Sequence, residues 1–362
     1  MTSFKDTTRA EGSRRRFDAA GAVAVPSAAL AGNMQEGIID ISGGLRLRHG
    51  ATLETARLGW RMTGPTSAPI VVALGGISGH RTVFTLDRGR IGWWSDIVGP
   101  DLALPSDRFR ILAFDYLGGS GETTGPSHGE WFPAVSTHDQ AELLRRLLDH
   151  LNIDSLFAIV GASYGGMVAM AFAQNYPERV ARLVVVSAAD RAHPMATAWR
   201  SLQRRIVRLG LDSSRPEAGL ELARGLAMTT YRSPNEFAAR FSGEPREING
   251  RFVFAVEEYL MARGEHYAKR FQPDGFLILS ESIDLHRIDA SQIRVPVTAI
   301  AVREDQLVPI ADMRALCARL PQAELLEMSS IYGHDAFLKE CGKLKALFAP
   351  ALGLAAAGEG RS

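Results

Sequence analysis

The sequence predicts an α/β fold, in which a mostly parallel central sheet is flanked by helices and carries an inserted helical cap. Short apolar segments of strand length alternate with helical segments in the first half of the chain, which is typical of a parallel sheet with helices on both faces. A long, mostly helical stretch then interrupts this alternation before strand-like segments return. The length of 362 residues fits one large α/β domain with an insertion.

The first elements along the chain are predicted as an antiparallel pair of strands at 37–48 and 53–62, because apolar and polar residues alternate there. The buried strands that follow are short apolar runs, at 70–74, 109–114, 156–160 and 183–186. Two helices separate the later strands. The first, at 137–151, has leucines at helical spacing and arginines on its other face, and the second follows position 163 and ends at Pro177.

The mostly helical stretch comes next and is predicted to form the cap, after which strands at 295–302 and 323–328 complete the sheet. The small apolar residues at 19–32 follow arginines, as in a signal peptide, but Pro26 interrupts them, and a disordered tail fits them better. The predicted organisation is a disordered tail at 1–35, a core at 36–188 and 295–350, the cap at 189–294 and a frayed tail at 351–362.

The composition excludes several classes of protein. The formal net charge is +1, so no overall field favours nucleic acid or an anionic membrane. No apolar run reaches the roughly 18 residues that a membrane-spanning helix needs. The two cysteines, Cys317 and Cys341, form neither a disulfide framework nor a metal-ligand spacing. We therefore expect a cytoplasmic protein that holds no metal and contacts neither nucleic acid nor membrane.

A motif for a catalytic nucleophile lies at 161–165, where Gly-Ala-Ser-Tyr-Gly matches G-x-S-x-G. It directly follows a predicted strand and directly precedes a predicted helix, which is the context that the motif requires. The turn pushes the hydroxyl of Ser163 out at the carboxyl end of the sheet, and Gly161 and Gly165 leave room where a Cβ would clash. The sequence therefore predicts the α/β-hydrolase fold with Ser163 as the nucleophile.

A serine hydroxyl needs a base to take its proton, and in this fold the acid and the histidine follow the serine in that order. His334 lies just after the last predicted strand, where a loop can bring it over Ser163. Asp305 and its neighbour Glu304 both follow the strand at 295–302 and point different ways, so only one of them should face the imidazole. We favour Asp305, partly because of the resemblance described below. The other downstream histidines fall in the cap and are expected to have surface or core roles: His193, His266 and His286.

Backbone N–H groups must stabilise the negative charge that develops on the attacked carbonyl oxygen. One donor is predicted to be the amide of Tyr164, the residue after the nucleophile. The second should come from the loop at 75–80, which follows a predicted strand, and Ile77 and Gly76 are both candidates. His80 in the same loop is expected to make local hydrogen bonds.

A series of further motifs runs through the chain between about 40 and 345. They are Gly92-Trp93-Trp94, Gly99-Pro100, Thr124-Gly125-Pro126, Phe132-Pro133, Asp139, Gly161 to Met167, Leu222-Ala223-Arg224, Thr230 to Ser233, Asp305 to Pro309 and Gly333 to Leu338. In order and spacing this series resembles the homoserine O-acyltransferases of the α/β-hydrolase fold. A resemblance over most of the chain is far more specific than any single motif.

Two segments depart from most members of that family. Tyr164 stands where methionine is more common, and the Gly-Gly-Ile-Ser-Gly-His loop at 75–80 differs as well. Both departures resemble a subgroup that transfers succinyl rather than acetyl. The segments at 193–205 and 285–289 are similar to that subgroup too.

The resemblance implies a ping-pong reaction in methionine biosynthesis. Acyl-CoA, as a co-substrate and with no other cofactor, would acylate Ser163, and the hydroxyl of L-homoserine would then attack with His334 as the base. Arg224 and Asp335 match the family positions that bind the amino acid, and a guanidinium and a carboxylate suit its carboxylate and its ammonium. The resemblance also implies a homodimer formed through the cap.

Several alternatives stay open at the level of sequence. The extra carboxylate of a succinyl group needs a donor, and the candidates by residue type are Arg200, Arg204 and Arg232. Acetyl-CoA is an alternative donor, and serine, one methylene shorter than homoserine, is an alternative acceptor that a pocket discriminates poorly. The same catalytic residues would make a serine esterase if water reached the acyl-enzyme. A receptor without turnover is the least favoured class, since all three predicted catalytic residues are present.

Overall fold

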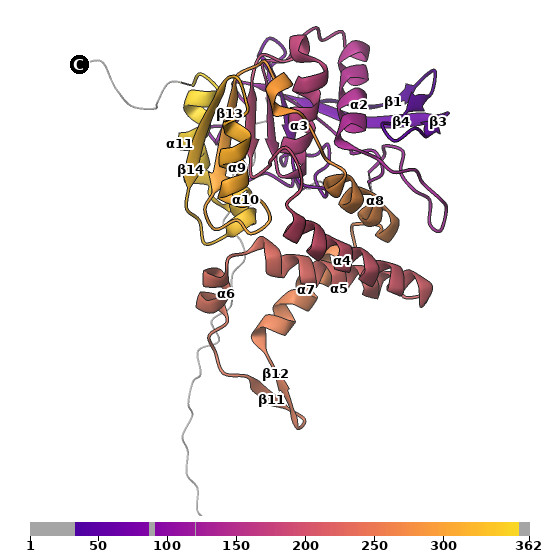
Figure 1. Ribbon diagram of the computed structural model, residues 1–362, viewed down its shortest axis with the longest axis vertical. Coiled ribbons are helices and arrows are strands. Elements are labelled where there is room, and N and C mark those ends of the chain that lie inside the picture. Colours follow the sequence, from indigo (N-terminus) through magenta and orange to yellow (C-terminus); the bar gives the residue numbers. More distant parts are fainter. Residues whose placement is uncertain (1–32, 87–90, 120, 355–362) are drawn as a thin grey trace, which may run out of the picture.

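The structure, a computed structural model, describes residues 33–86, 91–119 and 121–354. Of the tail predicted at 1–35, residues 1–32 lie outside the described residues, and so do residues 355–362 of the tail predicted at 351–362. Figure 1 shows a sheet with helices packed on it and a second group of helices across one end of that sheet.

The central sheet has eight strands in the order β1-β4-β8-β5-β9-β10-β13-β14. Their bounds are β1 Gln35–Ile41, β4 Ala56–Thr63, β5 Ile70–Leu74, β8 Arg110–Phe114, β9 Ala158–Ala162, β10 Leu183–Val186, β13 Val297–Val302 and β14 Ala323–Met328. β4 runs antiparallel to both β1 and β8, and all later neighbours are parallel. The predicted mostly parallel sheet is therefore confirmed, and the bounds of its parallel strands lie within two residues of the predicted ones.

The predicted antiparallel pair at the start of the chain is shorter than expected. Gly43 and Gly44 both have positive φ, 76° and 72°, and the turn they form separates β1 from β2. The short strands β2 Leu45–Arg46 and β3 Thr52–Leu53 pair with each other in a small sheet of their own. The alternating pattern of the sequence thus covers two small sheets, and only the first belongs to the central one.

The central strands are buried on both faces. In β5, Val72 belongs to an apolar cluster with residues of α2 and α3, whereas its neighbour Val71 belongs to a second cluster that includes Phe348 of α11. The helices named here are α2 Thr137–His150, α3 Tyr164–Asn175 and α11 Cys341–Ala351. Burial on both faces explains why the sequence of these strands is a continuous apolar run rather than an alternation.

A group of helices lies between β10 and β13 in the sequence: α4 Pro194–Asp212, α5 Pro216–Tyr231, α6 Pro234–Arg240, α7 Ala255–Ala268 and α8 Pro273–Asp284. Four of them begin with proline, whose fixed φ suits the first helical position. α4 and α5 approach so closely that a Cβ on Gly210 would lie 2.7 Å from the Cα of Gly219. We call this group the cap because it occupies the stretch predicted as such, and its independence as a domain stays a prediction.

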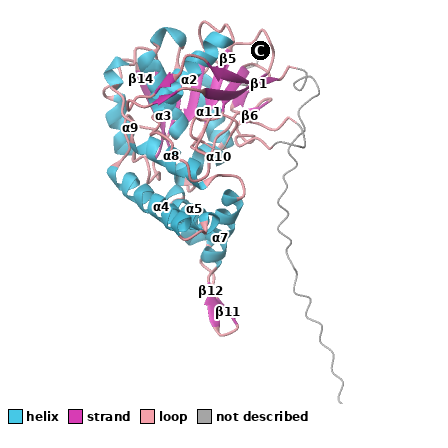
Figure 2. Ribbon diagram, turned by 90° about the vertical axis from the view of Figure 1, so that its right-hand side faces the viewer, coloured by secondary structure: helices cyan, strands magenta, loops and turns pink. Residues whose placement is uncertain are grey.

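A hairpin that was not predicted projects from the cap (Figures 1 and 2). It consists of β11 Arg246–Ile248 and β12 Arg251–Val253, which pair antiparallel. Asn249 and Gly250 at its turn have φ of 52° and 72°, as a two-residue turn of this kind requires. The Asn-Gly pair was therefore the available sequence signal.

The remaining elements are short: β6 Val98–Gly99, β7 Leu104–Pro105, η1 Pro177–Arg179, η2 Ala290–Gln292, α9 Ile310–Cys317, η3 Gly333–Asp335 and α10 Ala336–Lys339. Of these, η3 lies directly after the loop that follows β14 and carries the predicted base. Within the described ranges, no helix combines the length and the apolar character that crossing a bilayer requires.

Candidate active site

Ser163 lies in the sharp turn between β9 and α3, with φ of 54° and ψ of −123°. The flanking glycines permit this turn because the backbone is crowded on both sides. A Cβ on Gly161 would lie 2.4 Å from the carbonyl oxygen of Gly165, and a Cβ on Gly165 would lie 2.4 Å from the carbonyl of Leu74 in β5. The turn thus holds the serine hydroxyl at the carboxyl end of the sheet, in a backbone conformation that is unfavourable for a residue with a Cβ.

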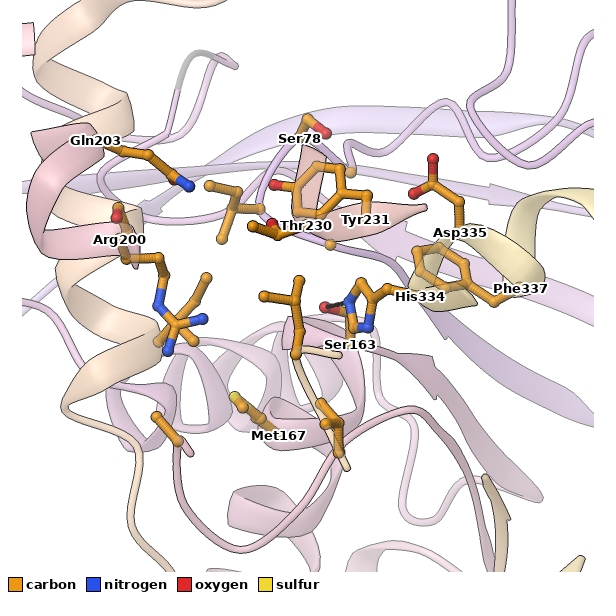
Figure 3. Close-up of a pocket in the computed structure, with 18 of the residues that line it drawn as sticks. Ser78, Ser163, Met167, Arg200, Gln203, Thr230, Tyr231, His334, Asp335 and Phe337 are labelled. Carbon is orange, nitrogen blue, oxygen red and sulfur yellow. Dashed lines mark hydrogen bonds between the residues drawn. The ribbon is translucent and has the colours of Figure 1, made fainter. Parts of the chain in front are cut away.

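Three side chains from distant loops form one hydrogen-bonded chain. The Oγ of Ser163 lies 2.8 Å from Nε2 of His334, and Nδ1 of His334 lies 2.7 Å from Oδ2 of Asp305 (Figure 3 shows the first of these bonds). The loops follow β9, β14 and β13, all at the same end of the sheet. In this arrangement the imidazole can accept the hydroxyl proton while the carboxylate fixes its orientation.

The backbone holds Asp305 in place. Its Oδ1 accepts hydrogen bonds from the amides of Leu307 at 2.8 Å and Val308 at 3.0 Å, which leaves Oδ2 for the imidazole. Glu304, the rival considered from sequence, instead accepts a hydrogen bond from the amide of Ser330 at 2.7 Å. The structure therefore brings Asp305, and not Glu304, to His334.

The electrostatic surroundings of His334 favour its protonated form. Burial alone would lower the pKa of His334, but the charge and the hydrogen bond of Asp305 outweigh burial, and the pKa is raised above its ordinary value. Asp335 contributes in the same direction and Arg200 opposes it. An imidazole in this setting is a better proton acceptor than a free one.

The predicted backbone donors lie beside the nucleophile. In the described part of the chain, neither the amide of Tyr164 nor that of Ile77 has an intramolecular acceptor, and both residues are buried. The amide of Gly76 has none either, so the choice between Gly76 and Ile77 as second donor stays open. The amide of Tyr164, together with that of Ile77 or Gly76, is therefore available to bind an oxyanion.

The carbonyl of Gly75 connects the loop at 75–80 to the nucleophile turn. It accepts a hydrogen bond from the amide of Gly165, directly after Tyr164, at 2.8 Å. It also accepts one from the hydroxyl of Tyr116, at 2.8 Å, in the loop that follows β8. The loop at 75–80 is therefore attached to the nucleophile turn by one shared acceptor.

Ser163 and His334 line a cavity of about 150 Å³, here called the first cavity. The sheet forms one side of it and the cap the other. Figure 3 shows Arg200 and Gln203 of α4 pointing into it from the side opposite Asp335. Gln203 lies in a segment noted for its resemblance, but no property of the sequence singled it out as a residue of the site.

The two residues predicted to bind the amino acid both line the first cavity. The guanidinium of Arg224 stacks over the rings of Tyr231 and Tyr267, at 5.0 and 4.6 Å from their centroids. No carboxylate among the described residues lies within ion-pair distance of it. Asp335 is paired with Nε of Arg232 at 2.9 Å. The guanidinium of Arg224, which has no carboxylate partner among the described residues, and the buried carboxylate of Asp335 thus line the same cavity.

Of the three arginines considered for a succinyl carboxylate, only Arg200 lines the first cavity. Its Nε and Nη2 bind Oδ1 of Asp284 at 2.8 and 2.6 Å, and Arg204 binds Oδ2 of the same carboxylate at 2.6 Å. Two guanidinium groups therefore share one carboxylate, which leaves one positive charge uncompensated. Arg232 is occupied by Asp335.

None of the three cap histidines is bonded to the chain of Ser163, His334 and Asp305. His286 is buried and bonds the hydroxyl of Thr137 and the carbonyl of Ala189, and burial lowers its pKa to about 3. His193 lines the first cavity but caps α4 by accepting from the amide of Met195. His266 is exposed on α7. No group of His, Cys, Asp or Glu in the described ranges is arranged to hold a metal ion.

Comparison with known proteins supports the same family. Residues 69–340 match the family described as the alpha/beta hydrolase fold. The homoserine O-succinyltransferase of Xanthomonas campestris pv. campestris is 44% identical over 314 residues, which cover 85% of this chain and 82% of that protein. The homoserine O-acetyltransferase of Thermus thermophilus is 34% identical, with 71% of each chain covered.

A solved structure has the same fold. The homoserine O-acetyltransferase from Staphylococcus aureus aligns with a TM-score of 0.77 and 23% identity, covering 90% of this chain and 98% of that one. At this identity the likeness concerns the fold alone.

Proposed function

The chain belongs to the α/β-hydrolase fold family and, within it, to the homoserine O-acyltransferases, and from this premise we propose that it transfers a succinyl group from succinyl-CoA to the hydroxyl of L-homoserine. The observation that carries the proposal is the hydrogen-bonded chain of Ser163, His334 and Asp305 beside a cavity that two guanidinium groups of the cap line, those of Arg200 and Arg224. No cofactor other than the acyl-CoA co-substrate takes part.

In the first half-reaction, Oγ of Ser163 attacks the thioester carbonyl while Nε2 of His334 takes its proton. The negative charge on the carbonyl oxygen is stabilised by the amides of Tyr164 and of Ile77 or Gly76. The carbon–sulfur bond then breaks, and the proton passes from His334 to the thiolate, so that CoA leaves as a thiol. Ser163 carries the succinyl group as an ester.

In the second half-reaction, the hydroxyl of homoserine attacks this ester. His334 takes the hydroxyl proton and returns it to Oγ of Ser163 as the ester bond to the enzyme breaks. The products are O-succinylhomoserine and the free enzyme. Asp305 keeps the imidazole in the required tautomer and stabilises its charged form through both steps.

The cavity offers one binding group for each charge of homoserine and for the carboxylate of the succinyl group. The guanidinium of Arg224 suits the carboxylate of homoserine. Asp335 suits its ammonium, which would share this carboxylate with Arg232. On the side of the cavity opposite Asp335 (Figure 3), Arg200 suits the second carboxylate of the succinyl group, because it reaches the cavity and shares its carboxylate partner with Arg204. An acetyl group has no charge for Arg200 to bind.

A panel of two donors against two acceptors tests the proposal. Thiol release from succinyl-CoA and acetyl-CoA is measured with homoserine, with serine and without acceptor. The proposal expects release from succinyl-CoA that depends on homoserine. Equal release without acceptor would identify an esterase, and a preference for acetyl-CoA or for serine would identify the corresponding acyltransferase.

We also propose that the protein acts in the cytoplasm, in methionine biosynthesis, as a homodimer formed through the cap. The projecting hairpin and its neighbours expose several large apolar side chains, which supports a covered surface there. These are Leu222, Ile248, Phe252, Phe254 and Met261. Phe252→Asp should shift the protein from dimer to monomer in light scattering, whereas the control Ile38→Asp, on the edge strand β1, should leave the dimer intact.

A further inference from the structure

Asp335 is the first member of a buried cluster of charges that continues into the cap. Its Oδ2 lies 2.9 Å from Nε of Arg232, at the end of α5. Nη1 of Arg232 in turn lies 3.7 Å from Oε1 of Glu236, in the first turn of α6. The side chains of Arg232 and Glu236 are each 8% exposed, and neither residue lines the first cavity. They can therefore act on a substrate bound there only through Asp335.

Arg232 is close to Asp335 but is not aligned on it. The N–H at its Nε has no hydrogen-bond acceptor among the described residues, although Oδ2 of Asp335 is within ion-pair distance. One guanidinium thus lies between two carboxylates, near to one and within reach of the other. A buried cation in this position can change how it is divided between them.

Glu236 has unused capacity to bind a cation. Its Oε1 lies 3.4 Å from Nη1 of Arg240, which is 44% exposed. Its Oε2 is buried and has no hydrogen-bond partner in the described part of the chain. A buried carboxylate oxygen without a partner is costly, so such an atom calls for an explanation. A shift of the Arg232 guanidinium toward Glu236 would supply the missing partner.

The backbone around Arg232 is attached to the loops that carry the catalytic residues. Its carbonyl accepts a hydrogen bond from Nε2 of Gln306, in the loop after β13, at 3.0 Å. The hydroxyl of Ser233 donates to the carbonyl of Ile331, in the loop that leads to His334, at 2.5 Å. These bonds involve no side-chain atom of Arg232, so its guanidinium can shift while the backbone stays in place.

We propose that Glu236 is a positioning residue for the acceptor, and that it binds the guanidinium of Arg232 when the ammonium of homoserine binds Asp335. The proposal rests on the proposed function, because it concerns the amino acid of that reaction. Without Glu236, Asp335 alone would face two cations, the ammonium and Arg232, and one buried positive charge would stay uncompensated. With Glu236, each of these cations has a carboxylate of its own.

The kinetic test separates acceptor from donor. Glu236→Gln should raise KM for homoserine about tenfold, the size expected for losing one contact between charged groups, with kcat almost unchanged. The value of kcat/KM for succinyl-CoA, which reports only the first half-reaction, should not change. Glu257→Gln is the matched control, because Glu257 lies in the first turn of α7, is exposed and does not line the first cavity. Equal losses for donor and acceptor would show a structural role and overturn the proposal.

A second acceptor makes the result independent of how much protein folds. γ-Hydroxybutyrate is homoserine without the ammonium, so the ratio of kcat/KM for the two acceptors cancels the concentration of active enzyme. In favour of homoserine, this ratio should fall about tenfold in Glu236→Gln. It should fall by a smaller factor in Glu236→Asp, whose shorter side chain keeps the charge but lies farther from Arg232. An unchanged ratio in either variant would contradict the proposed contact.

Direct binding separates this proposal from the proposed function. L-Homoserine is titrated calorimetrically into Ser163→Ala protein, which lacks the nucleophile, so the identity of the acyl donor does not matter. Binding that weakens about tenfold when Glu236→Gln is added supports the proposal even if the donor panel identifies another acyl group. Binding of equal strength refutes it even if succinyl transfer is observed. Acceptor-independent thiol release without any homoserine binding would overturn the proposed function as well.

Discussion

The two walls of the first cavity are held in different ways. On the sheet side, Ser163 is fixed by a turn with positive φ and two crowded glycines, and Asp305 by two backbone amides. On the cap side, Arg200 is held by a carboxylate of another helix, Asp284. The reaction centre thus depends on backbone geometry, whereas the contact proposed to select the acyl group depends on side chains. Selectivity can therefore change without disturbing the chemistry.

The largest expected effect comes from removing the nucleophile on the sheet side. Ser163→Ala should reduce succinyl transfer by on the order of 10⁴-fold or more, because no other hydroxyl of the described residues is bonded to His334. Acceptor-dependent thiol release measures this loss. The thermal unfolding midpoint serves as the control and should change little, since the hydroxyl makes one hydrogen bond. A variant with substantial transfer would exclude Ser163 as the nucleophile.

Asp305→Asn should have the next largest effect, on the order of 10³-fold or more in kcat, because an amide at this position favours the wrong tautomer of His334. It also tests the raised pKa of His334. The base must be neutral to accept a proton, so activity falls as pH drops through that pKa. Loss of the Asp305 charge should move this acidic limb to lower pH. An acidic limb that stays in place would show that another group titrates.

On the cap side the expected effect is smaller and selective. Arg200→Gln should lower kcat/KM for succinyl-CoA by about 10- to 100-fold, the range for a hydrogen bond to a charged group, and change acetyl-CoA much less. Arg204→Gln is the matched control, because Arg204 shares Asp284 but does not line the cavity. If both donors lost activity equally, Arg200 would have a structural role only.

The smallest expected effect is on stability, at the hydrogen bond that joins the sheet side of the first cavity to the cap side. The hydroxyl of Tyr164 lies 2.7 Å from the hydroxyl of Ser282 in α8, and both side chains are buried. Tyr164→Phe should lower the free energy of unfolding by about 1 kcal/mol, because it leaves one buried hydroxyl without its partner. Denaturant unfolding measures this change. A double-mutant cycle with Ser282→Ala should show coupling, and strict additivity would argue against the link.

The difference between the two walls also explains what the sequence could predict. The parallel strands and the turn at Ser163 follow from local patterns, because apolar runs and crowded glycines leave marks within a few residues. The proximity of His334 and Asp305 followed from the order of elements in the fold. The hairpin at Asn249-Gly250 had a local signal that the mostly helical surroundings obscured.

Other features have no local signal. The sequence offered three equivalent arginines for the succinyl carboxylate. Only the three-dimensional packing of the cap shows that Arg200 lines the cavity and that Arg204 and Arg232 do not. The bond from Tyr116 to the carbonyl of Gly75 joins loops 41 residues apart. Likewise, a cavity of about 600 Å³ beside the loop at 75–80 is bounded by loops and a helix end that are distant in the chain. Pairwise packing of this kind appears only in three dimensions.

The shared acceptor at Gly75 has a consequence for how the site tolerates motion. Because its carbonyl accepts hydrogen bonds from the amide of Gly165 and from the hydroxyl of Tyr116, a displacement of the loop at 75–80 also disturbs the turn that carries the amide of Tyr164. The two proposed oxyanion donors, the amide of Tyr164 and the amide of Ile77 or Gly76, should then become mobile together on heating. Catalytic power would be lost abruptly rather than in graded steps, at a temperature below that of global melting.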